Sequence, residues 1–217
     1  MTTFPGSPKL LKGGIVLIDP VTGAVQRVIV LQYSPDTLSR SLQVQGVAES
    51  GDRSQALRLK GEPIETIKLE AEIDATDQLE FPDQNQAAIR VGIFPQLAAL
   101  ETLVYPTSSQ LSTNNRLAKA GTLEIAPMET LLPLFIWSKT RIIPVRVTEL
   151  SITEEAFDAN LNPLRAKVSL GLRVLSVNDL GFDHKGGNLF MNYLQMKENL
   201  RSTSGGSLSA LGITGLP

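Results

Sequence analysis

The chain has 217 residues, a formal net charge of −2 and no cysteine. The absence of cysteine excludes disulfides and thiolate metal sites, and the near-neutral charge argues against a general nucleic-acid binder, because phosphate contacts need clustered lysine and arginine. Hydrophobic residues make up 42% of the chain but aromatic residues only 5%, so we expect an aliphatic core.

The first half of the chain shows the alternation typical of β-strands. Residues 14–18 and 25–33 are apolar and β-branched around an Asp-Pro…Gly turn, which predicts a hairpin. Residues 39–45 alternate polar and apolar, residues 46–55 form a polar exposed loop, and residues 65–73 are the clearest strand. One face of that strand carries Ile67, Leu69, Ala71 and Ile73, and the other carries Thr66, Lys68, Glu70 and Glu72.

The period changes in the middle of the chain. Residues 81–86 read as a polar linker. Leucines then recur at helical spacing after Pro95, which predicts a helix over residues 95–105 that ends before Pro106. Residues 107–120 are polar and are expected to be an exposed loop.

Strand patterns return at residues 131–137, 142–152 and 165–174. Within the second of these, the parity of the apolar residues shifts after Val147, which indicates a bulge. Strands, one helix and then strands predict a mainly β domain over residues 1–175. We expect an antiparallel β-barrel or sandwich from about residue 14 onward, with one flanking helix and a helical extension at the C-terminus.

That extension, residues 176–217, begins with a loop over residues 176–187. Residues 188–200 have helix-forming composition, and residues 201–217 are rich in serine and glycine and are expected to be disordered alone. An apolar stripe on the helix consists of Leu189, Tyr193, Met196 and Leu200. A helix this short is marginal by itself, so we predict that the stripe docks on a neighbouring subunit or a partner protein; the alternative is that it packs on its own domain.

Residues able to carry chemistry are sparse. His184 is the single histidine, and it fits an exposed loop better than a general base. The carboxylates of residues 70–74 and 154–155 fit a solvated sheet face, and those of residues 74–83 lack the spacing of a calcium loop. No phosphate-binding glycine motif is present. We therefore predict no enzymatic activity, no metal and no cofactor. Trp137, at a strand end, is a candidate for an interface as well as for the core.

Three segments, taken in order, resemble the tube-domain proteins of contractile injection systems, including baseplate adaptors that often carry a LysM module. They are VIVLQYSPDTL (28–38), ETIKLEAEIDATD (65–77), and the set APMETLLPLFIW (126–137), RIIPVRV (141–147) and FDANLNPLRA (157–166). Ser34 stands where asparagine is usual in that family, and Ser138 where glycine is usual. No LysM module is visible after residue 175.

The resemblance implies a phage-tail-tube type of β domain that assembles as a homo-hexamer, a ring between the inner tube and the spike or baseplate. Partners would be the inner-tube protein, the spike protein and other baseplate subunits. The inner-tube protein itself is an alternative, and a cell-wall- or carbohydrate-binding β module is a third, disfavoured by the low aromatic content. With no signal-peptide pattern and no stretch near ~18 apolar residues, we expect synthesis in the cytoplasm, without direct membrane insertion, as part of an assembled particle.

Overall fold

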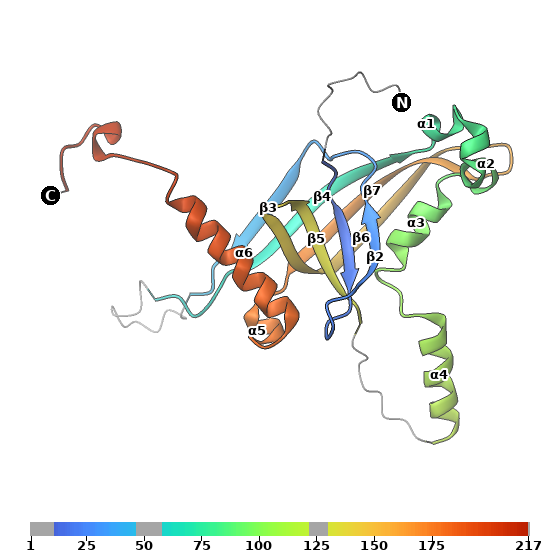
Figure 1. The fold of residues 1–217 in the computed structure, drawn as a ribbon, viewed down its shortest axis with the longest axis horizontal. Helices are drawn as coiled ribbons and strands as arrows, with labels where there is room; N and C mark the ends of the chain where they lie inside the picture. Colours follow the sequence, from blue (N-terminus) through green and yellow to red (C-terminus); the bar gives the residue numbers. More distant parts are fainter. Residues whose placement is uncertain (1–10, 47–57, 122–129, 217) are drawn as a thin grey trace.

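The computed structural model describes residues 11–46, 58–121 and 130–216 (Figure 1). The loop predicted at residues 46–55 therefore lies, apart from Gly46, outside the described residues, as do residues 126–129 of the third resembling segment. Within the described part, no helix is both long and apolar enough to cross a membrane.

One antiparallel sheet organises the molecule, with seven strands in the order β2-β1-β5-β6-β7-β4-β3. The strands are β1 (Gly14–Ile18), β2 (Val25–Val30), β3 (Leu38–Gln43), β4 (Ile64–Asp74), β5 (Leu132–Ser138), β6 (Arg141–Phe157) and β7 (Pro163–Val174). Each segment predicted as a strand is a strand, and the predicted β1–β2 hairpin is present. The bulge predicted after Val147 is also confirmed, because the register between β6 and β7 shifts between Val147 and Glu149.

The sheet curls around a main aliphatic core, as the β-barrel or sandwich prediction requires. The predicted inner face of β4 is buried throughout, and its outer face is exposed or half-buried. Side chains from β1, β2, β5, β6 and β7 join the same cluster, with Ile15, Phe135, Val145 and Leu172 each at most 1% exposed. Alternation of period two therefore places one continuous core on the concave side of the sheet.

A side-chain amide links two distant parts of this curled sheet. Just beyond β2, Gln32 donates through Nε2 to the backbone oxygen of Asp74 at 2.6 Å. Its Oε1 accepts from the Asp74 N–H at 3.1 Å. Gln32 thereby satisfies both backbone groups at the end of β4 in the way that a strand would.

Helices are more numerous than the one flanking helix and one C-terminal helix that the sequence predicts. They are α1 (Thr76–Leu79), α2 (Gln86–Val91), α3 (Phe94–Glu101), α4 (Ser108–Lys119), α5 (Val177–Leu180) and α6 (Lys185–Arg201), with 3-10 turns η2 (Pro82–Gln84) and η3 (Leu208–Leu211). The helix predicted over residues 95–105 is α3, with Pro95 in its first turn. It ends earlier than predicted, at Glu101, and continues as turns toward Pro106.

The loop prediction for residues 107–120 is wrong, because α4 occupies most of that segment. A capping box starts the helix: the Thr107 side chain accepts from the Gln110 N–H, and the Gln110 side chain accepts from the Thr107 N–H. These two bonds satisfy backbone donors that a helix otherwise leaves open. The polar composition of the segment led to the loop prediction, although the Thr-x-x-Gln pattern that begins a helix is present in the sequence.

The loop predicted over residues 176–187 contains α5 and the first turn of α6, and its glycine pair serves close packing. Gly186 and Gly187 are buried at the start of α6. A Cβ on Gly187 would lie 1.9 Å from the backbone oxygen of Gly181, which follows α5. These glycines therefore hold α6 tightly against α5 and do not extend it away from the sheet.

Candidate assembly interface

The C-terminal helix is held on the sheet by a buried carboxylate. Glu65 lies on the inner face of β4 and is only 4% exposed. Its Oε1 accepts from Arg40 Nε at 2.8 Å and from Tyr193 Oη at 3.1 Å, and the Arg40 Nη2 atom lies 2.6 Å from the same oxygen. Its Oε2 accepts from Lys197 Nζ at 2.9 Å, and the same ammonium lies 3.9 Å from the centre of the Tyr193 ring. Residues from β3, β4 and α6 thus meet in one cluster, the Glu65 cluster (Arg40, Glu65, Tyr193 and Lys197).

The electrostatics of the Glu65 cluster favour the ionised carboxylate. Burial raises the pKa of Glu65, but the hydrogen bonds and positive charges of Lys197 and Arg40 outweigh it, so the pKa ends below its ordinary value. Burial raises the pKa of Tyr193, whose phenol stays a donor. Each buried polar atom of Glu65 has a partner, so the cluster fixes the position of α6 without an unpaired buried charge.

The predicted stripe on this helix divides between the chain's own core and its surface. Tyr193 is buried in the main core. Leu189 packs against a smaller cluster of Ile18, Leu132 and Leu134. Met196 is half-buried, and Leu200 is 55% exposed. The inner part of the stripe therefore packs on the chain's own sheet, and docking on another subunit through Leu200 stays a prediction.

Trp137 lies near the end of β5 and packs on the main core as a half-buried side chain. Its ring stacks on Phe135 with 5.7 Å between ring centroids and 27° between planes. A Cβ on Gly13 would lie 2.7 Å from Cε3 of this indole, so glycine is required there. Trp137 thus packs on the main core, and its role at an interface stays a prediction.

Two of the side chains considered for chemistry, His184 and Asp74, have structural partners. His184 is the N-cap of α6, and its Nδ1 accepts from the Gly186 N–H at 3.0 Å. Asp74 accepts from Arg165 Nε at 2.8 Å and from the Thr76 N–H at 2.7 Å. Among the described residues, no group of three or more histidine, cysteine, aspartate or glutamate side chains is placed to hold a metal ion.

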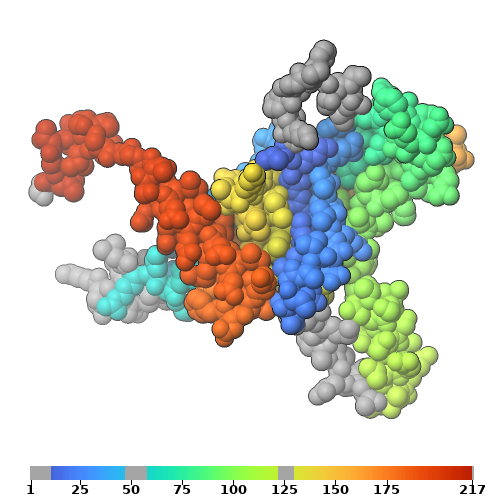
Figure 2. Space-filling view, in the orientation of Figure 1, coloured from blue at the N-terminus to red at the C-terminus, as the bar shows by residue number. Residues whose placement is uncertain are grey.

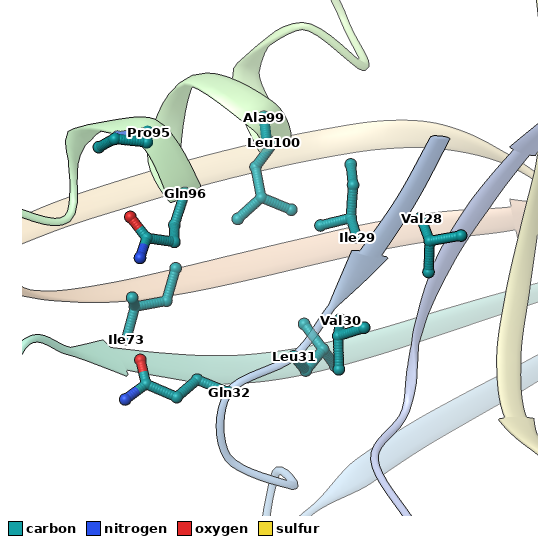
Figure 3. Close-up of a pocket in the computed structure, with 10 residues that line it drawn as sticks. All are labelled: Val28, Ile29, Val30, Leu31, Gln32, Ile73, Pro95, Gln96, Ala99 and Leu100. Atoms are coloured by element: carbon teal, nitrogen blue, oxygen red, sulfur yellow. The ribbon is translucent and has the colours of Figure 1, made fainter. Parts of the chain in front are cut away.

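A groove that sequence reasoning missed lies between β2 and α3 (Figure 3). It has a volume of about 250 Å³ and is lined by Val28, Ile29, Val30, Leu31, Gln32, Ile73, Pro95, Gln96, Ala99 and Leu100. None of these residues is charged. The residues come from segments far apart in the sequence, so only the fold brings them together.

Two exposed elements stand apart from the sheet (Figures 1 and 2). No residue of α4 is buried, and its Leu111 and Leu117 are 55% and 40% exposed. Beyond α6, residues 202–216 are exposed throughout and include η3. Four apolar side chains in this C-terminal segment face solvent, namely Leu208, Leu211, Ile213 and Leu216.

No family model and no curated protein matches the chain. Two solved structures are similar over 75% of this chain and 90% of their own. One is a chain from the tail of an empty GTA particle with C6 symmetry, at 13% identity and a TM-score of 0.29. The other is from the virion of a native gene transfer agent particle, at 11% identity and a TM-score of 0.27. Both TM-scores are below those of chains with a common fold, so the functional argument rests on the chain's own residues.

Proposed function

We propose that the chain is a non-catalytic structural subunit of a contractile injection system, in which six copies form a ring that joins the inner tube to the spike or baseplate. The observation that carries the proposal is α4, a helix with no buried residue that presents Leu111 and Leu117 to solvent. Twelve residues make a marginal helix alone in water. Exposed apolar groups on such an element are typical of a surface that is covered in an assembly.

The convex face of the sheet supports the same proposal. It carries cross-strand ion pairs of both signs, among them Lys68–Glu149 at 3.5 Å, Arg165–Asp74 at 2.8 Å and Lys167–Glu155 at 3.2 Å. A face of balanced, solvated charges suits the water-filled channel of a ring better than a dry interface between subunits.

We propose this particular assembly because three segments of the chain resemble tube-domain proteins. Residues 28–38 cover the second half of β2 and the connection to β3, and residues 65–77 cover β4 from its second residue and the start of α1. The described part of the third segment covers β5, the first half of β6 and the β6–β7 turn. The resemblance therefore falls on the sheet itself, and the sixfold ring and its partners are proposed from it.

Copy number in the particle tests the proposal. Particles would be purified from cells that produce the chain with a label, and the label would be counted and located by electron microscopy. We expect six copies at one end of the inner tube. Copies along the whole tube would identify the inner-tube protein instead, and particles that lack the label would contradict both assignments.

A further inference from the structure

The groove between β2 and α3 is lined by uncharged residues and is therefore suited to uncharged side chains. Ile29 of β2 points toward Leu100 of α3, and Ile73 of β4 lies beside Gln96 (Figure 3). Pockets that enclose drug-sized ligands usually exceed ~300 Å³, so a groove of about 250 Å³ is better suited to one or two aliphatic side chains of a protein segment.

One polar atom in this groove lacks a partner. Gln96 lines the groove, and its Oε1 is the buried side-chain acceptor without a hydrogen bond among the described residues. A buried acceptor without a hydrogen-bond partner destabilises the structure that contains it. An occupant that brings a backbone N–H or a hydroxyl to Gln96 would remove that cost.

The chain itself carries a segment with matching chemistry. Residues 202–216 contain no charged residue, have six serines and threonines as donors, and expose Leu208, Leu211, Ile213 and Leu216. Leu211 and Leu216 are 74% and 78% exposed. The segment's hydrogen bonds are local, such as that from the Ile213 N–H to the Leu208 oxygen at 3.2 Å.

Placement points to a second copy as the source of this segment. In Figure 1 the C-terminal segment leaves α6 at one end of the molecule, and β2 and α3 lie at the other. Fully extended at ~3.3 Å per residue, residues 203–216 reach up to about 45 Å. Because groove and segment lie on opposite sides of one chain, docking between copies is head-to-tail, which generates closed rings when the rotation closes.

We infer that residues 208–216 of one copy dock in the β2–α3 groove of the next, with their aliphatic side chains against Ile29, Ala99 and Leu100 and a donor to Gln96 Oε1. The inference rests on the proposed ring function and adds the contact that joins its subunits.

Because the chain has no cysteine, introduced thiols report on this contact directly. One full-length chain would carry Ala99→Cys in the groove, and a second, tagged chain would carry Leu211→Cys. The two would be mixed and oxidised at ring-forming concentration. Docking raises the local concentration of the two thiols, so we expect about tenfold more mixed disulfide than in a control pair that uses Glu70→Cys on the exposed outer face of β4. Adding Ile213→Asp to the tagged chain should lower the yield to the control level.

Three results would overturn the inference. The first is an equal yield from the Glu70→Cys control, and the second is a yield unaffected by Ile213→Asp. The third is an intramolecular disulfide in a chain that carries both cysteines and is diluted into excess cysteine-free chain, which would show that a copy binds its own segment. Rings that assemble without the crosslink would reject the contact but leave the proposed function standing, whereas a chain that stays monomeric would reject both.

Discussion

Lys197 on α6 places its Nζ 2.9 Å from Oε2 of Glu65 on β4, across 132 positions of sequence. Tyr193, one helical turn earlier, reaches the other carboxylate oxygen at 3.1 Å. This pairing ties the C-terminal helix to β4, the strand next to the β3 edge of the sheet. The buried carboxylate therefore helps to fix α6, and with it the place where the C-terminal segment leaves the domain.

Replacing that carboxylate should loosen the helix. Glu65→Gln leaves Lys197 and Arg40 without the anion they both bind, and losing hydrogen bonds to a charged group of this kind costs about 2 kcal/mol. We expect a lower free energy of unfolding in urea by about that amount. The matched control is Glu70→Gln on the solvent face of the same strand, which should change stability by no more than about 0.5 kcal/mol; equal effects of the two variants would contradict a structural role for the cluster.

The same carboxylate predicts a pH dependence of stability. In the folded chain the pKa of Glu65 lies below its ordinary value of 4.5, because Lys197 and Arg40 outweigh the effect of burial. A group with a depressed folded pKa contributes stability above its ordinary pKa and loses it as the pH falls through the folded value. The stability difference between the unmodified chain and Glu65→Gln should therefore shrink as the pH is lowered from 6 toward about 3. A difference that stays constant with pH would show that Glu65 does not titrate as inferred.

The contact between α5 and α6 allows a steric test. A methyl group on Gly187 would overlap the Gly181 backbone oxygen, so Gly187→Ala should force the helices apart and cost about 1–3 kcal/mol. Gly205→Ala, where nothing lies within 4 Å of the added carbon, is the control and should leave the melting temperature unchanged. Thermal melts followed by circular dichroism would compare the two variants.

The sheet could be predicted from the sequence because its alternation is local. The segments at residues 39–45, 65–73 and 142–152 each show their own period of two, and even the bulge after Val147 appears as a change of parity. The same parity places Glu65 on the inner face with Ile67 and Leu69, which is a signal of a buried carboxylate. Its partners could not be predicted, since Tyr193 and Lys197 join it only after the chain has folded.

The candidate interface was less predictable for a related reason. The stripe on α6 predicts an apolar face but does not predict which surface covers it. In the structure, Tyr193 is buried in the chain's own core. The groove beside Gln96 combines segments around residues 30, 73 and 97, so no local pattern reports it. For α4, the capping box of Thr107 and Gln110 is visible in the sequence and could have predicted the helix, but the polar composition favoured a loop.

That capping box predicts a local change in stability. Thr107→Ala removes the side-chain acceptor of the Gln110 N–H, which typically costs a helix about 1 kcal/mol. Since no residue of α4 is buried, the loss should be confined to this helix. Amide hydrogen exchange should accelerate at residues 110–119 and remain unchanged in β4 and β7. Faster exchange throughout the sheet would mean that α4 contributes to the core after all.

The exposed leucines of α4 give the most direct test of assembly. Leu111→Asp places a charge on a side chain that is 55% exposed and packs in no core of the described chain, so we expect an unchanged melting temperature. If Leu111 is covered by another subunit, burying the new carboxylate there is unfavourable, and the yield of rings should fall by about tenfold or more. Ser112→Asp adds the same charge to the neighbouring exposed position and serves as the control. Rings formed equally well by both variants, as measured by mass photometry, would show that α4 faces solvent in the assembly and would remove the observation on which the proposed function depends.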